Sequence, residues 1–126
     1  MADTVLVVDD DPMVHRVLQQ YLRRAGYQMT TANSGRQAIE VAARDLPQLI
    51  IMDVMMPEMS GLEALRQLKS TEATKDIPVV VLTSSAVRVT ELESTASGAA
   101  FFLTKPFTES QLVTAVRRLA SEASGR

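Results

Sequence analysis

Short apolar runs recur along the chain, and most of them end in a charged or hydroxyl side chain. Four runs, residues 4–8, 49–52, 78–82 and 100–104, are apolar at nearly every position. Continuous apolar runs of this length, bounded by turn residues, are typical of strands that are buried on both faces of a sheet. A fifth run, residues 27–32, is more polar, as expected of an edge strand. The pattern therefore predicts five strands.

The first helix is predicted by its two ends as well as by its apolar spacing. Asp11 offers a side-chain N-cap, and Pro12 suits the first helical position. Arg23 and Arg24 fall in the last turn, where positive charge complements the helix dipole, and Gly26 can adopt a left-handed C-terminal cap. These signals place a helix between the first two strands.

Four further helices are predicted between and after the other strands. Ser34 and Thr108 are each followed three residues later by glutamine, which is the pattern of a capping box. Ser60 precedes another segment with leucine at helical spacing. The remaining helix, over residues 87–97, has a diffuse apolar pattern and is expected to end at Gly98.

The alternation of strands and helices determines the fold class. Such alternation produces a parallel sheet with right-handed crossovers and helices on both faces. We therefore expect an α/β fold, a doubly wound (βα)5 sheet, in a single domain over residues 1–126. Its core would span about 4–123, and residues 121–126 would be a frayed helix end or the start of a linker. Placing strand 4–8 beside strand 49–52 creates a switch point, where ligands of open α/β sheets bind.

Composition narrows the class of protein. The chain has 126 residues, 46% of them hydrophobic, and no cysteine. A chain of this size buries a core without disulfides, and the lack of cysteine suits a reducing cytoplasm. The N-terminus lacks the basic and apolar regions of a signal peptide, and no apolar run approaches the ~20 residues that span a bilayer. The net charge is −2, with scattered lysine and arginine. We expect a cytoplasmic protein that neither inserts into membranes nor binds nucleic acid.

The polar residues that follow the strands would gather at one edge of the sheet. Asp9 and Asp10 follow the first strand, Asp53 the third, Thr83 the fourth and Lys105 the fifth. At about 5 Å and an effective dielectric of about 20, two carboxylates repel each other by roughly 3 kcal/mol, so a cation is expected among them. Oxygen ligands without cysteine favour Mg²⁺. The set predicts a site for Mg²⁺ and a phosphoryl group.

Asp53 is the candidate nucleophile of this site. Carboxylates form aspartyl phosphates in covalent catalysis, and phosphoryl transfer depends mostly on positioning and charge stabilisation. Lys105 would place a positive charge, and Thr83 a hydroxyl donor, beside the transferred group.

Taken together, these motifs resemble the receiver domain of two-component response regulators, of the single-domain chemotaxis type. The resemblance covers about residues 4–123. The residues that carry it are Asp9-Asp10, Asp53 with Met56-Pro57 and Gly61, Thr83-Ser84, and Lys105-Pro106-Phe107. The resemblance implies a flavodoxin-like fold with strand order 2-1-3-4-5, for which the chemotaxis receiver is a known example. It also implies a signalling switch that modifies only itself, rather than an enzyme.

The resemblance assigns a donor and a set of metal ligands. It implies that Asp53 accepts a phosphoryl group from a sensor histidine kinase or a histidine phosphotransfer protein, as part of a phosphorelay. It implies that Mg²⁺ is bound by Asp10, Asp53 and the backbone carbonyl of Met55, with Asp9 acting indirectly.

The remaining implied roles concern the phosphoryl group and the switch. Thr83 and Lys105 would contact the phosphoryl group, and the peptide bond from Lys105 to Pro106 would be cis. Thr83 and Phe102 would form the switch, with the fifth strand and the last two helices as the surface for a downstream protein target. Phe102 lacks the hydroxyl of family members with tyrosine, so it would act by packing. The implied assembly is a monomer or a weak phosphorylation-dependent dimer.

Other functions make different demands on the same sheet edge. A phosphatase of the haloacid-dehalogenase type needs a second acid two residues after the nucleophile, where this chain has Met55. A flavodoxin-like cofactor binder needs a phosphate loop where this chain has Asp9-Asp10-Asp11, which would repel phosphate. A phosphocarrier needs an active histidine, whereas His15 is expected on the solvated face of the first helix. An interaction module with an intact but unused site stays open.

Overall fold

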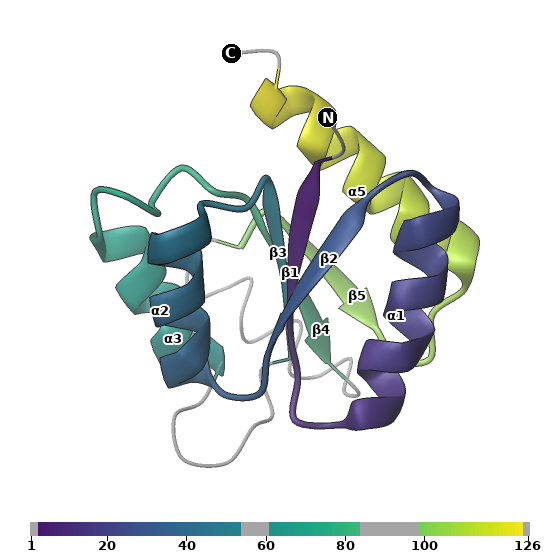
Figure 1. Ribbon diagram of the computed structural model, residues 1–126, viewed down its shortest axis with the longest axis horizontal. Helices are drawn as coiled ribbons and strands as arrows, with labels where there is room; N and C mark the ends of the chain where they lie inside the picture. Colours follow the sequence, from purple (N-terminus) through teal and green to yellow (C-terminus); the bar gives the residue numbers. More distant parts are fainter. Residues whose placement is uncertain (1–2, 54–60, 84–98, 125–126) are drawn as a thin grey trace.

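The computed structural model describes residues 3–53, 61–83 and 99–124 (Figure 1). The elements in chain order are β1 Thr4–Val8, α1 Pro12–Arg24, β2 Gln28–Ala32, α2 Gly35–Asp45, β3 Leu49–Asp53, α3 Gly61–Ser70, β4 Val79–Thr83, β5 Phe101–Thr104 and α5 Glu109–Ser124. All five predicted strands are present, with ends that differ from the prediction by at most one residue. The helix predicted over residues 87–97 and the carbonyl of Met55 lie outside the described residues.

The five strands form one parallel sheet in the order β2-β1-β3-β4-β5. Figure 1 shows α1 and α5 on one face of the sheet and α2 and α3 on the other. This arrangement confirms the flavodoxin-like fold and places the more polar β2 at an edge, as predicted. Because β1 pairs with both β2 and β3, the chain reverses its direction of winding between β1 and β3.

Side chains of the central strands alternate between two hydrophobic clusters, one on each face of the sheet. In β1, Val5 and Val7 point into the cluster beneath α1 and α5, whereas Leu6 and Val8 point into the cluster beneath α2 and α3. All residues of β3 and β4 are buried. Burial on both faces explains why these strands are continuous apolar runs in the sequence instead of alternating ones.

The helix ends have the caps that the sequence predicts. Asp11 Oδ1 accepts a hydrogen bond from the backbone N–H of Met13 at 2.9 Å. Thr108 and Gln111 exchange two hydrogen bonds, each from a backbone N–H to the other residue's side-chain oxygen. Gly26 has a φ of 92°, the left-handed conformation expected after α1.

The last helix includes most of the segment 121–126, which was expected to be a frayed helix end or the start of a linker. It continues to Ser124, so residues 121–124 extend α5. None of the helices in the described part of the chain combines the length and the apolar character needed to cross a bilayer.

Leu46, at the C-terminus of α2, adopts a strained backbone conformation. Its φ of 47° and ψ of 62° are left-handed, and the side chain is 57% exposed. A left-handed residue with a Cβ costs about 1–2 kcal/mol, and the following proline disfavours helical geometry here as well.

We expect Leu46→Gly to raise the free energy of unfolding by about 1 kcal/mol, measured by urea denaturation. Leu46→Ala is the matched control, because it removes the exposed side chain but keeps the Cβ strain. Equal stabilisation by the two variants would contradict the explanation from backbone strain.

Candidate functional site

Three polar side chains lie at the carboxyl ends of neighbouring strands. Asp9 directly follows β1, Asp53 ends β3 and Thr83 ends β4, and these three strands are adjacent in the sheet. All three residues are buried, with exposed fractions of 1%, 7% and 0%. The structure therefore brings together three side chains that are at least 30 positions apart in the sequence. The parallel strands place these three side chains at the same edge of the sheet.

Lys105 joins this group from the loop after β5. Its Nζ donates to Asp53 Oδ2 at 2.8 Å and to Asp9 Oδ2 at 3.3 Å. Its backbone N–H donates to the carbonyl oxygen of Thr83 at 2.7 Å, and its peptide bond to Pro106 is cis. Backbone and side chain together fix the ammonium between two buried carboxylates.

Asp9 is held by contacts to each of its polar groups. Its backbone N–H donates to the carbonyl oxygen of Ala32 at 3.2 Å, and its Oδ1 accepts from the backbone N–H of Asp11 at 2.9 Å. Its Oδ2 accepts from Lys105, and its carbonyl oxygen lies 2.7 Å from His15 Nε2. The residue that follows the first strand is thus anchored by four contacts.

Burial and charge act in opposite directions on the two kinds of titratable group. Burial raises the pKa of Asp9, an effect that the hydrogen bond from Asp11 and the charge of Lys105 offset only in part. Burial lowers the pKa of Lys105, but the hydrogen bond and charge of Asp53, followed by those of Asp9, outweigh it, so the pKa is raised. The ammonium is therefore the positive charge that compensates the buried carboxylates.

The expected convergence of three carboxylates is only partly seen. Asp9 and Asp53 meet at Lys105, whereas Asp10 is exposed in the β1–α1 loop. In the described ranges, no three acidic, histidine or cysteine side chains gather into a metal-binding group. The physical reason is that the Lys105 ammonium already lies between the two buried carboxylates.

These residues nevertheless fit a hard divalent cation. Two buried carboxylates already hold one positive charge, and Asp10, the next residue after Asp9 in the chain, offers a third carboxylate from the β1–α1 loop. Carboxylate oxygens are the ligands that Mg²⁺ takes in proteins. The donor set of Asp9, Asp10 and Asp53 is therefore suited to Mg²⁺.

Phe102 and Thr83 lie on the same face of the sheet. Phe102 pairs with Val81 in the β4–β5 register, and Thr83 is two residues beyond Val81 on the same strand. Phe102 is half-buried and packs against the cluster beneath α2 and α3. Thr83 and Phe102 are therefore diagonal neighbours on adjacent strands, on the face beneath α2 and α3.

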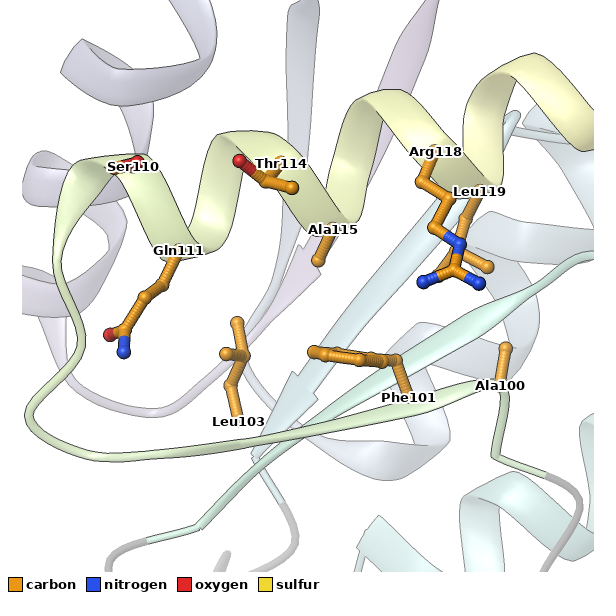
Figure 2. A pocket seen from close by; sticks show the side chains of 9 residues that line it. All are labelled: Ala100, Phe101, Leu103, Ser110, Gln111, Thr114, Ala115, Arg118 and Leu119. Carbon is orange, nitrogen blue, oxygen red and sulfur yellow. The ribbon is translucent and has the colours of Figure 1, made fainter.

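Phe101 points to the opposite face, into a groove between β5 and α5 (Figure 2). The groove has a volume of about 700 Å³, and Phe101 is 38% exposed. Apolar residues Leu103, Ala115 and Leu119 line it together with Arg118. We expected the output surface over the fifth strand and the last two helices, without distinguishing the faces of the two adjacent phenylalanines.

The expectation for His15 is wrong in one respect. The residue is half-buried, and its ring contacts the backbone of Asp9, so it is not simply a solvated histidine. Its position four residues after the N-cap Asp11, one turn into α1, was the available signal, because such a side chain can reach back to the preceding loop.

Known proteins match this chain over nearly its whole length. The family model of the response regulator receiver domain matches residues 5–117. The chain is 40% identical over 137 aligned residues to the response regulator PleD of Caulobacter vibrioides, covering 100% of this chain and 30% of PleD. It is 42% identical over 118 residues to the response regulator MprA of Mycobacterium leprae, covering 91% of this chain and 50% of MprA. The chain thus spans half or less of the length of each of these two relatives.

Solved structures give the same result. The chemotaxis response regulator CheY4 of Vibrio cholerae superposes with a TM-score of 0.86 at 32% identity, covering 94% of this chain and 99% of that one. The receiver domain of the sensor histidine kinase PA1611 from Pseudomonas aeruginosa, solved with magnesium in its active site cleft, superposes with a TM-score of 0.88 at 28% identity, covering 96% and 99%. The chain therefore belongs to the family of response regulator receiver domains, the phosphoacceptor domains of two-component signalling.

Proposed function

We propose that this domain accepts a phosphoryl group on Asp53, from a phosphohistidine of a partner kinase or phosphotransfer protein, in a reaction that needs Mg²⁺. The modified domain then changes its contacts with a downstream protein. The observation that carries this proposal is the geometry around Asp53. Its carboxylate ends a buried central strand, and its Oδ2 lies 2.8 Å from the Lys105 ammonium at the edge where ligands of such sheets bind.

The transfer step is a displacement at phosphorus. A carboxylate oxygen of Asp53 forms a bond to phosphorus while the bond from phosphorus to the donor's imidazole nitrogen breaks. The nitrogen keeps the bonding electron pair, and the donor, protonated on its other ring nitrogen, leaves as neutral imidazole. The negative charge on the transferred oxygens needs compensation. Lys105 Nζ can turn from the carboxylate to these oxygens without leaving the site, because it already bridges Asp9 and Asp53.

Mg²⁺ would be held by the carboxylates of Asp10 and Asp53, with Asp9 beside them and the carbonyl of Met55 as the further ligand that the family resemblance implies. When bound, it supplies charge neutralisation for the phosphoryl oxygens. The magnesium-containing cleft of the PA1611 receiver domain supports this assignment by similarity. The oxygen-rich donor set in this chain supports it on chemical grounds.

The response is proposed to pass through Thr83 and Phe102 to the groove beneath α5. A phosphoryl group that draws the Thr83 hydroxyl toward it alters the packing on the face that Thr83 shares with Phe102. Phe102 is followed and preceded in β5 by Leu103 and Phe101, which line the groove (Figure 2). Movement of this strand therefore changes the surface that a downstream protein would meet.

Beryllofluoride with Mg²⁺, which mimics the phosphoryl group, should shift the amide resonances of residues 100–105 as well as those around Asp53. Coupling between two sites in one protein is typically about 1–3 kcal/mol, enough to shift a two-state equilibrium measurably. Two-dimensional NMR with and without the mimic provides the measurement. Shifts confined to residues adjoining Asp9, Asp53 and Thr83, with none at residues 100–103, would contradict the switch and favour an interaction module with an unused site.

The direct test of the function is covalent labelling. With Mg²⁺ and a small phosphodonor such as acetyl phosphate, the protein should gain one phosphoryl group that is stable in acid and labile in base, as measured by intact mass. Chelation of Mg²⁺ with EDTA should prevent the gain. A protein that stays unlabelled while binding Mg²⁺ would overturn the proposed acceptor function.

A further inference from the structure

His15 makes a contact that the proposed chemistry does not use. It lies on α1, half-buried, and its Nε2 is 2.7 Å from the carbonyl oxygen of Asp9. A carbonyl oxygen can only accept, so Nε2 must carry the hydrogen and donate it. The side chain therefore reaches back from the helix to the loop that carries the acidic residues.

The bond acts on the peptide unit between Asp9 and Asp10. The carbonyl of Asp9 and the N–H of Asp10 belong to one rigid plane, so holding the oxygen fixes the orientation of the whole unit. On one side of this unit, Asp9 is held by the backbone of Ala32 and by Lys105. On the other side, Asp11 caps α1. Asp10 lies between these two anchored residues, and the contact from His15 holds the peptide unit that joins Asp9 to Asp10.

Asp10 is the acidic residue whose direction depends most on this peptide unit. Its side chain is exposed, in contrast to the buried carboxylates of Asp9 and Asp53. Octahedral Mg²⁺ demands closely defined ligand positions. An exposed carboxylate on a loop meets that demand only when the backbone that carries it is fixed.

We propose that His15 is a positioning residue for the divalent-cation site. By donating from Nε2 to the carbonyl oxygen of Asp9, it fixes the peptide unit that sets the direction of Asp10 toward a cation shared with Asp53. This inference rests on the proposed function, because it concerns the same cation. It differs from that function in assigning a role to a residue that neither binds the cation nor contacts the phosphoryl group.

The test compares Mg²⁺ affinity in the metal-free protein and in His15 variants by calorimetric titration, without a phosphodonor. His15→Ala should raise the dissociation constant for Mg²⁺ about tenfold, the lower end of the effect of removing an outer-shell partner. His15→Gln should restore most of the affinity, because its amide nitrogen can occupy nearly the place of Nε2 and donate the same bond. Gln19→Ala, an exposed change one turn further along α1, is the matched control and should leave affinity unchanged.

The sign of the change separates positioning from simple electrostatics. A charged imidazolium near a cation site repels the cation, so its removal would tighten Mg²⁺ binding, whereas loss of a positioning bond weakens it. Wild-type affinity in His15→Ala, tighter binding, or a loss that His15→Gln fails to restore would each overturn the inference. Failure of the wild type itself to bind Mg²⁺ would instead overturn the proposed function. Amide spectra remote from the loop verify that each variant is folded.

Discussion

Asp53→Asn is expected to abolish covalent phosphorylation by acetyl phosphate, while the domain keeps its fold. The asparagine side chain has nearly the shape of aspartate but lacks a carboxylate nucleophile. Asp53 is 7% exposed at the end of a fully buried strand, so a substitution that preserves shape leaves the packing of β3 intact. Lys105 keeps its bond to Asp9 in this variant. Intact-mass measurement after incubation with Mg²⁺ and the donor gives the result.

Asp10→Asn is the matched control for this experiment. It removes one carboxylate from the same edge of the sheet but leaves Asp53 in place, so it should still be labelled, at a lower rate because Mg²⁺ binds less tightly. Equal labelling of Asp53→Asn and the wild type would show that another group is the acceptor. Loss of labelling in both variants, with Mg²⁺ restored to saturation, would contradict the separation of acceptor and ligand roles.

The strands were predictable because burial on both faces leaves a strong signal in the sequence. Every residue of β3 and β4 is buried, so the runs that end in Asp53 and Thr83 are apolar throughout. The parallel arrangement then follows from the alternation with helices. The order of the strands came from family resemblance, because alternation alone allows several orders in which these edges meet.

The site was predictable as a set of residues but not as a set of contacts. Sequence spacing places Asp9, Asp53 and Lys105 at one edge, yet it does not show that the ammonium lies between the two carboxylates. The flexible lysine side chain has many rotamers, and the one it adopts depends on two partners that are 96 and 52 positions away in the sequence. The contact of His15 with the Asp9 carbonyl was missed for a similar reason, since its partner is a backbone atom that carries no residue-specific signal.

Lys105→Met is expected to lower the free energy of unfolding of the metal-free protein by about 2–3 kcal/mol at pH 7.5. That is at or just below the roughly 3–5 kcal/mol cost of breaking a fully buried ion pair, because the Lys105 side chain is 26% exposed whereas Asp9 and Asp53 are nearly enclosed. Methionine fills similar space, so the loss reflects charge and not a cavity. Urea denaturation measures it. Lys75→Met, which removes a surface pair with Glu72, is the matched control and should change stability by less than about 0.5 kcal/mol.

The loss in free energy of unfolding caused by Lys105→Met should be smaller at acidic pH and in the presence of Mg²⁺. The pKa of Asp9 is raised in the folded protein by burial, and removing the ammonium raises it further, so protonation of Asp9 favours the folded state more in the variant. The raised pKa of Lys105 means that its own contribution is complete at neutral pH and is lost only as pH rises through that alkaline value. The difference in the free energy of unfolding between variant and wild type therefore becomes smaller as pH falls toward the titration range of Asp9.

Mg²⁺ should stabilise the variant more than the wild type, because a bound cation replaces the missing charge. A deficit that changes with neither pH nor Mg²⁺ would show that the lysine supports packing instead of compensating the two carboxylates.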